Sequence, residues 1–366
     1  MDKAVTLYEL IERSAKAALD LQGQDGTMPP GHNGPWNDPE TPLRNTGYWL
    51  VTFLKAYKIT GSPKYLEAAQ RAADFLASDA ARPGGGAFWH RNNPKREASN
   101  GLIGQAWTIE ALASASEQLD RPELGKLAEG VFLRHRFDAS RGLWSKLNVD
   151  GTRSRLSRTF NQQIWFAAAG SMVARLPQGS TGIGERVHRF LDHLPQYLHF
   201  DSRGIFNHVL DPMRLSRRRH FINLRSKQSG AYKKRTDLLA VGYHTFNMYG
   251  LALLNQTCAG HPFWENKSLP RMWESIISQR FNQLAENNPY SYRYNPSGIE
   301  IAFALFVFRP DLTDLRGTYL AEQFRRWFNF KTNFMEGGGA GDPLTLAARL
   351  YEATRLPDCL IFPRET

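Results

Sequence analysis

Segments of two kinds alternate along this chain, and both repeat their apolar residues with a helical period. In the first kind, apolar residues recur at three- and four-residue spacing and charged residues occupy the other side, as in PKYLEAAQRAADFLAS. In the second kind, apolar or small residues occupy nearly every side, as in NGLIGQAWTIEALASA and IEIAFALFVF. A helix that is apolar on every side is buried on every side. The pattern therefore predicts half-exposed outer helices alternating with buried inner helices.

The alternation runs through six pairs of segments, which favours a closed ring with two layers. We predict an all-α (α/α)6 toroid of six helical hairpins, with short β or extended segments in its loops. No Pro-, Ser- or Gly-rich linker divides the sequence, so we expect a single domain over 1–366. An irregular α-solenoid is the structural alternative. The predicted outer helices are 3–22, 63–79, 122–136, 183–199, 270–287 and 312–329, and the predicted inner helices are 44–60, 99–118, 158–176, 237–257, 297–308 and 342–355.

The predicted loops differ in length with their direction. Loops from an inner helix to the next outer helix are short, as at 60–62 and 309–311, whereas those from outer to inner helices are mostly long. In an up-and-down ring, all the long loops lie on one face, together with the N-termini of the inner helices. Free N–H groups and helix dipoles favour anions there, and functional residues concentrate on long loops. We therefore expect one binding cleft on this face.

Charge and aromatic content suggest what the cleft binds. The formal net charge is +11, and aromatic residues make up 12% of the chain, with nine Trp. A basic surplus favours anionic partners, and Trp and Tyr favour ring stacking with sugars. We expect an acidic oligo- or polysaccharide as the partner, with nucleic acid less favoured. The loop at 214–235 carries nine Lys or Arg and no acid, so we predict a substrate-recruiting flap that includes Arg217, Arg218 and Arg219.

Cysteine content and the N-terminal segment bear on location and cofactors. Two cysteines, Cys258 and Cys359, are too few for a disulfide framework or a Cys-based metal site, and we expect no metal and no cofactor. The first residues read as an amphipathic helix containing acids rather than a signal peptide. No apolar run is long enough to span a bilayer, so we expect no membrane insertion and a cytoplasmic location.

Two cleft-face loops gather polar and aromatic residues. The first is rich in Pro and Gly, which fix the backbone and can hold polar groups in place. A carboxylate, an imidazole and a Trp together could clamp and protonate a glycan, although caps and salt bridges of an ordinary turn would use the same residues. The candidates are His32, Asn33, Trp36, Asp38, Glu40 and Arg44 on the first loop and inner helix, and Trp89 and His90 on the second loop.

Polar residues also interrupt the apolar inner helices. A buried polar side chain needs a protein partner or faces a wet cleft, and His244 and Asn247 are three residues apart on one helix face. The alternation of Tyr290, Tyr292 and Tyr294 is that of an extended strand and would direct all three rings to one side. The other candidates are Gln105, Asn161, Gln163 and Tyr243.

Two carboxylates lie at the predicted starts of inner helices. Glu300 occupies the first turn of a very apolar helix, where it would be either a cap or an acid with a raised pKa. Asp342 precedes Pro343, which is the usual arrangement of an N-cap, and that interpretation is the favoured one.

The twelve-helix alternation and the NGLIGQAW and DGTMPPG segments resemble the six-hairpin glycosidase superfamily. The resemblance implies a hydrolase with carboxylates at the inner-helix N-termini, or a lyase that uses Tyr and His. We expect a glycoside hydrolase acting on an acidic glycan, in which one carboxyl group protonates the leaving oxygen and another activates water. The alternatives are β-elimination on a uronate and a non-catalytic glycan-binding protein. The hydrolase candidates are Asp38, Glu40, Glu300 and Asp342, and the lyase candidates are Tyr243, His244, Asn247 and Asn161.

Overall fold

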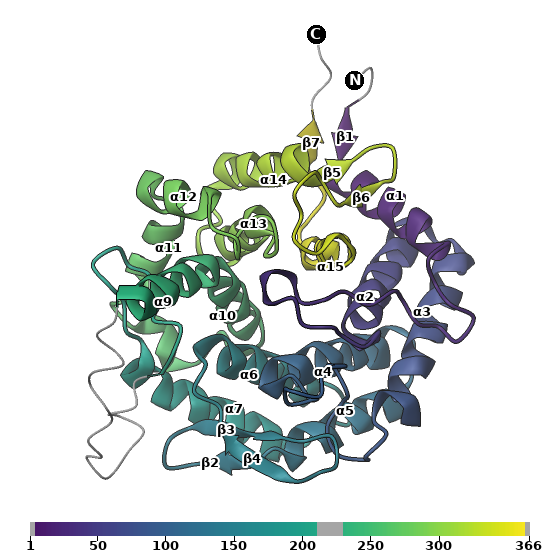
Figure 1. Cartoon of the computed structure of the whole chain (residues 1–366), viewed down its shortest axis with the longest axis horizontal. Helices are drawn as coiled ribbons and strands as arrows, with labels where there is room; N and C mark the ends of the chain where they lie inside the picture. The colour runs from purple at the N-terminus through teal and green to yellow at the C-terminus, as the bar shows by residue number, and fades with distance from the viewer. Residues whose placement is uncertain (1–3, 211–229, 363–366) are drawn as a thin grey trace.

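The computed structural model describes residues 4–210 and 230–362 and shows a ring of helices in two layers (Figure 1). The predicted all-α (α/α)6 toroid is confirmed. The inner layer consists of α2 (Leu43–Thr60), α4 (Gly101–Gln118), α6 (Phe160–Ala174), α10 (His244–Cys258), α13 (Ser297–Phe308) and α15 (Pro343–Ala348), the last continued by the 3-10 helix η6 (Arg349–Arg355). The outer layer consists of α1 (Leu7–Leu19), α3 (Pro63–Ala77), α5 (Pro122–Arg134), α7 (Thr181–His193), α11 (Pro270–Ile276), α12 (Gln279–Glu286) and α14 (Thr313–Trp327).

The two layers bury their apolar residues against each other as the pattern predicts. In α13 every residue from Ser297 to Leu305 is buried, so this helix has no exposed face in its first nine positions. The outer helix α3 instead buries a stripe that includes Tyr65, Ala69 and Leu76, and exposes charged residues on its other side. Burial of a side chain the size of Leu contributes about 1.5–3 kcal/mol. The core between the layers therefore stabilises the ring and fixes where the inner helices begin.

Three elements differ from the sequence prediction. Helix α9 (Gly230–Gly242) occupies the end of the predicted loop at 200–236, and α10 begins directly after Tyr243. The outer helix predicted at 270–287 is split into α11 and α12, because the Ser278 side chain accepts a hydrogen bond from the Phe281 N–H and caps a new helix. Of the predicted flap at 214–235, residues 214–229, including Arg217, Arg218 and Arg219, lie outside the described residues, and residues 230–235 belong to helix α9 rather than to a loop.

Short strands occupy the loops and the chain ends. In the loop before α6, β2 (Phe137–Asp138), β3 (Leu143–Leu147) and β4 (Arg153–Leu156) form an antiparallel sheet in that order. In the loop before α15, β5 (Phe328–Asn329) pairs with β6 (Phe334–Met335). Near the two ends of the chain, β1 (Val5–Thr6) pairs with β7 (Leu360–Phe362), so the first and last helical elements meet there (Figure 1).

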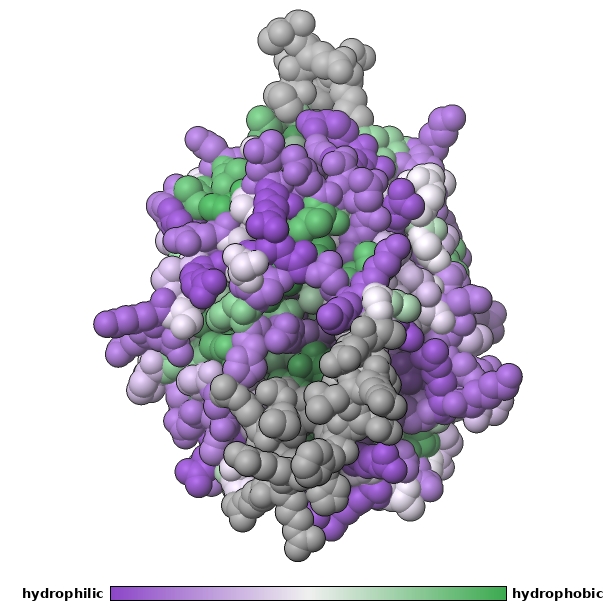
Figure 2. Space-filling model, turned by 60° about the vertical axis from the view of Figure 1, so that its left-hand side comes forward, coloured by the Kyte–Doolittle hydropathy of each residue, from purple (hydrophilic) through white to green (hydrophobic). Residues whose placement is uncertain are grey.

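Hydrophilic residues dominate the described surface in Figure 2, where hydrophobic residues form only smaller patches. None of the helices in the described ranges has both the length and the hydropathy needed to cross a membrane.

Candidate functional site

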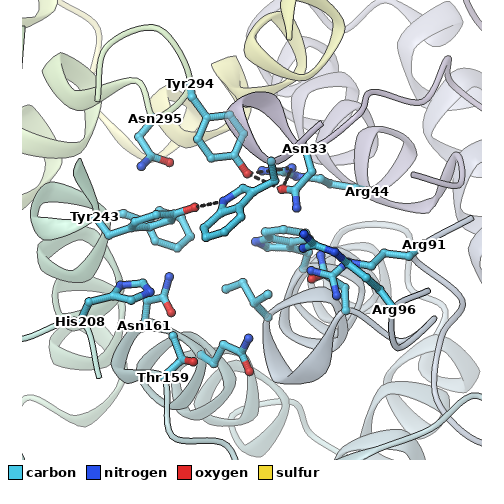
Figure 3. Close-up of a pocket in the computed structure, with 16 residues that line it drawn as sticks. Asn33, Arg44, Arg91, Arg96, Thr159, Asn161, His208, Tyr243, Tyr294 and Asn295 are labelled. Carbon is cyan, nitrogen blue, oxygen red and sulfur yellow. Dashed lines mark hydrogen bonds between the residues drawn. The ribbon is translucent and has the colours of Figure 1, made fainter. Parts of the chain in front are cut away.

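A cavity of about 180 Å³ lies where the inner helices begin. Its walls come from the first turns of α2, α4, α6 and α10 and from the loops that precede the inner helices, which is the face where the sequence predicts a cleft (Figure 3). This volume is below the range typical of drug-sized ligand pockets and suits a ligand the size of one sugar ring. The lining residues are Asn33, Trp36, Arg44, Arg91, Arg96, Asn100, Ile103, Trp107, Thr159, Asn161, Gln162, His208, Tyr243, Phe246, Tyr294 and Asn295.

The first long loop reaches the cavity through a left-handed turn. Asn33 and Gly34 have φ angles of 61° and 55°, which Asn and Gly adopt more readily than other residues. A Cβ atom on Gly34 would lie 2.2 Å from the Tyr294 ring, so the close approach of the two segments requires glycine. Asp342 holds the turn by accepting hydrogen bonds from the N–H groups of His32 (2.9 Å) and Gly34 (3.1 Å). The cavity wall is thereby fixed to the N-terminus of α15.

Three arginines make one side of the cavity positive. Arg44 is buried and donates to Asn33 Oδ1 and to Glu40, and its guanidinium lies 4.0 Å from the centre of the Trp107 ring. Arg91 pairs with Asp38 at 2.7 Å, and Arg96, which is 42% exposed, lies 3.7 Å from the same carboxylate. Within the described chain, no Asp or Glu lines the cavity. The guanidinium groups and the inner-helix N-termini together favour an anionic ligand.

His208 and Tyr243 lie across the cavity from Arg91 and Arg96 (Figure 3). The rings of His208 and Tyr243 are 5.1 Å apart between centroids, and Trp36 Nε1 donates a 2.8 Å hydrogen bond to the Tyr243 hydroxyl. Burial lowers the pKa of His208 to about 4 and raises the pKa of Tyr243 well above its ordinary value. At neutral pH, the site thus offers an uncharged imidazole that can accept a proton and a protonated phenol that can donate a hydrogen bond.

Several buried polar atoms of the lining have no hydrogen-bond partner among the described residues. They are Asn100 Nδ2, Trp107 Nε1, Asn161 Oδ1 and His208 Nδ1. A buried polar group without a partner costs about 1–3 kcal/mol, so such groups normally face water or a ligand. Their clustering around one cavity favours a polar ligand. Over the described ranges, no group of three or more His, Cys, Asp or Glu side chains is placed to hold a metal ion.

The four predicted catalytic carboxylates lie behind the cavity or away from it. Asp38 and Glu40 are the buried partners of the lining arginines. Glu300 pairs with Arg349 at 2.7 Å and accepts a hydrogen bond from Thr245. Burial raises the pKa of Glu40 and of Glu300, although Arg44 and Arg349 respectively oppose the rise. Asp38, Glu40 and Glu300 are therefore counter-ions of arginines in this structure.

Asp342 is the N-cap that its position before Pro343 suggests. Its side chain accepts a hydrogen bond from the Thr345 N–H at 3.2 Å. Burial would raise the pKa of Asp342, but the hydrogen bonds from His32, Thr345 and Gly34 and the charge of Arg44 hold it below its usual value. The carboxylate is thus ionised and fully used in holding the loop.

The structure brings together some of the other predicted residues and separates the rest. Those that line the cavity are Asn33, Trp36, Arg44, Asn161, Tyr243 and Tyr294. Gln105 and Gln163 make the same kind of contact. The side-chain amide of Gln105 accepts from the N–H of Phe88 and donates to its carbonyl oxygen, and Gln163 does the same with Trp144. Each contact holds a loop against its inner helix. The side chains of Gln105 and Gln163 therefore bond to backbone groups and do not face the cavity.

Two predicted histidines belong to the core. His90 contacts Thr108 Oγ1 at 3.0 Å, and His244 contacts Ser275 Oγ at 2.7 Å and accepts from the Phe206 N–H. Burial lowers the pKa of both imidazoles to about 3. Asn247 is also buried and, like His32, does not line the cavity.

The remaining aromatic candidates diverge. Residues 290–294 form turns rather than an extended strand, so the three tyrosine rings do not share one side. Tyr290 lies against Trp36 and Tyr243 behind the lining, Tyr292 stacks under Arg326 of α14, and Tyr294 reaches the cavity. Trp89 donates from its indole to the Arg91 carbonyl oxygen and does not line the cavity.

The main lining residue that sequence reasoning missed is His208. It lies on the long loop before α9, where the only signal was an imidazole on a cleft-face loop. Its position is set by backbone pairing with the start of α6, because the Phe160 N–H donates to the His208 carbonyl oxygen at 3.0 Å. Arg96 and Asn295 were also missed, since the surplus of similar residues elsewhere gave no reason to select them.

The ring and the cavity at its inner-helix N-termini define a protein with the six-hairpin glycosidase fold. No family model matches the sequence. Solved structures with this fold include cellobiose 2-epimerase from Spirochaeta thermophila, at 15% identity and a TM-score of 0.65. A D-mannose isomerase is similar at 14% identity and a TM-score of 0.65. Each comparison covers 95% of this chain and 96% of the other chain. An α-1,6-mannanase from Salegentibacter sp. is similar at 11% identity and a TM-score of 0.58, over 95% of this chain and 98% of the other.

A curated relative is far more similar in sequence. Archaeal glycosylation protein Q from Haloferax volcanii is 40% identical over 374 aligned positions, which cover 98% of this chain and 99% of the relative. The chain therefore belongs to the family of archaeal glycosylation protein Q.

Proposed function

We propose that this protein is a carbohydrate-active enzyme that binds an acidic sugar and transfers a proton at one of its carbon atoms, as an epimerase or isomerase does. The observation that carries the proposal is the set of titratable groups lining the cavity. It comprises three arginines, His208 and two tyrosines, and, over the described chain, no carboxylate. Arginines anchor a carboxylate or phosphate, and a neutral imidazole is the usual general base.

The positions of these groups suggest a division of roles. Arg91 and Arg96 would hold the acidic group and so present the carbon next to the sugar's carbonyl group to His208. His208, whose Nδ1 has no partner in the described chain, would accept the proton released from that carbon. The Tyr243 hydroxyl already accepts from Trp36, so its own proton is available to the oxygen on which negative charge develops. Return of the proton from His208 to the adjacent carbon would complete an isomerisation, whereas epimerisation would take its proton from a donor, such as water, on the opposite face of the first carbon.

The comparisons support a role in carbohydrate chemistry. The curated relative is named for glycosylation, and the solved structures of the same fold include enzymes named for sugar epimerisation, sugar isomerisation and mannan cleavage. The last of these keeps glycoside hydrolysis as the second candidate. In this chain, hydrolysis would require Asp38 or Glu40 to leave its arginine and enter the cavity.

β-Elimination on a uronate uses the same kind of base as epimerisation and differs in expelling a leaving group. Of the lyase candidates, Tyr243 and Asn161 line the cavity, whereas His244 and Asn247 do not. A non-catalytic glycan-binding protein would use the same cavity without turnover.

A single incubation in D₂O separates these reactions. The protein is mixed with a panel of acidic mono- and oligosaccharides, and the products are read by NMR, ultraviolet absorbance and a reducing-sugar assay. We expect deuterium on one sugar carbon without new reducing ends. New reducing ends without deuterium would overturn the proposal in favour of hydrolysis. A rise in absorbance would instead establish elimination, and binding without any product would establish a glycan-binding protein.

A further inference from the structure

A second concavity adjoins the cavity and shares His208 with it. This groove has a volume of about 620 Å³, within the range typical of ligand sites, and lies on the α9 side of the ring that Figure 2 turns forward. Residues from the start of α6, the loop at 199–210 and α9 line it. Because His208 borders both spaces, the groove lies next to any molecule held beside His208 in the cavity.

The groove carries an unbalanced positive charge. Its two acids, Asp201 and Asp237, are both bound by Arg203, whose Nε donates to Asp201 Oδ2 at 2.8 Å and whose Nη2 reaches Asp237. Arg158 and Lys233 also line the groove and are exposed, and neither forms an ion pair with a described residue. The described lining thus holds three cations, Arg158, Arg203 and Lys233, against two acids, and this surplus favours an anion.

Unsatisfied polar atoms also point to a ligand. His199 Nε2 and His208 Nδ1 are both buried, and neither has a hydrogen-bond partner among the described residues, yet both side chains line the groove. A hydroxyl or acidic oxygen of the ligand would satisfy His199 Nε2, while His208 Nδ1 stays free to act as the base of the proposed reaction.

The backbone fixes the spacing between the cationic end and His208. The Leu210 N–H donates to the Arg158 carbonyl oxygen at 2.8 Å, and Thr159 and Val209 form an antiparallel bridge. Arg158 and His208 thus lie on two paired backbone segments, which keeps the cationic side of the groove close to His208.

From this arrangement we propose that the groove binds a second anionic group of the substrate, carried beyond the reacting sugar as a neighbouring uronate or as a phosphate ester. The inference rests on the proposed function, because the cavity must hold the reacting sugar. The substrate is then an acidic disaccharide or a glycosyl phosphate rather than a free sugar acid.

The test compares one paired variant with a matched control. The Arg158→Ser/Lys233→Ser variant removes both groove cations, and Arg155→Ser/Lys234→Ser removes two exposed cations close in sequence that line neither space. Calorimetry at low and high salt then measures binding of galacturonate, digalacturonate and glucuronate 1-phosphate.

We expect the groove variant to bind digalacturonate or glucuronate 1-phosphate about 3- to 10-fold more weakly at low salt, with a smaller loss at high salt, because exposed charge interactions are individually weak and screened. Galacturonate binding and the control variant should be unchanged. The ligand that shows the loss identifies the source of the second anion. Equal binding by wild type and groove variant would overturn the groove assignment alone, whereas a wild type that binds none of the three ligands would overturn the proposed function as well.

Discussion

Two buried arginines of this ring contrast sharply. Arg349 lies in the core between Glu300 and Glu352 and also donates to the backbone oxygen of Tyr294 and to Asn295. Arg44 lies beside the cavity, where it forms an ion pair with one carboxylate, Glu40, and its hydrogen-bond partners Tyr48, Asn33 and Tyr294 are neutral. The core arginine is thus surrounded by acids, whereas the cavity arginine contributes to a positive wall.

The contrast teaches why carboxylates near inner-helix N-termini are not by themselves a catalytic signature. Taking a charge out of water costs several kcal/mol unless a partner compensates it. In this chain the predicted acids Glu300 and Glu40 provide that compensation for arginines. In the proposed reaction, the chemistry is therefore assigned to groups that face the cavity, His208 and Tyr243 among them.

The largest expected effect concerns the core cluster. Arg349→Met leaves Glu300 and Glu352 buried without their partner and should lower the free energy of unfolding by about 3–5 kcal/mol. Arg44→Met should cost less, because it strands one acid rather than two. Urea denaturation measures both. Equal losses for the two variants would contradict the contrast between core and cavity.

The next effect is a dependence of stability on pH from the two core histidines. The pKa of His90 and of His244 is lowered to about 3, against about 6.5 in the unfolded chain, so the unfolded state binds more protons as the pH falls below 6.5. Each histidine should therefore reduce stability by about 1.4 kcal/mol per pH unit between pH 6 and 4. In His244→Gln, the free energy of unfolding measured by denaturation should fall less steeply with decreasing pH over this range, by about 1.4 kcal/mol per pH unit. An unchanged slope would show that His244 is not buried in its neutral form.

A smaller effect should separate acidic from neutral sugars at the cavity. Arg91→Gln removes one lining charge and leaves Arg96 beside Asp38. Loss of one charge-assisted hydrogen bond should weaken binding of an acidic sugar about 10-fold, while binding of its neutral counterpart stays within about 2-fold. Calorimetry on the two sugars checks this, with the exposed Arg153→Gln as control. Equal weakening of both sugars would remove the anion-binding role.

The smallest effect concerns the N-cap of α15. Asn has one acceptor oxygen where Asp342 uses two, so Asp342→Asn keeps either the bonds to His32 and Gly34 or the bond to Thr345; it should cost about 1 kcal/mol and should leave turnover nearly unchanged. The matched Asp342→Ala variant should lose about 1–2 kcal/mol. A loss of turnover in Asp342→Asn by more than about 100-fold, with the fold intact, would restore this residue as a catalytic carboxylate.

The sequence predicted the ring well and the site only in part, for physical reasons. The alternation of amphipathic and all-apolar helices reports burial directly, so layers and loop directions follow from it. The partner of a buried acid is set by packing: Glu300 meets Arg349 from another helix, and no local pattern reveals that contact. His208 was missed because its place depends on pairing between its loop and the start of α6.

The most direct test of the proposed proton transfer compares deuterium exchange at a sugar carbon in two variants, His208→Asn and Asp38→Asn. Each variant is incubated in D₂O with the acidic sugar that the wild type turns over, and exchange at carbon is followed by NMR. We expect that His208→Asn still binds the sugar but exchanges at least about 100-fold more slowly, because it lacks the general base, whereas Asp38→Asn remains within about 10-fold of wild type. Normal exchange in His208→Asn, together with abolished turnover in Asp38→Asn, would contradict the proposed proton transfer.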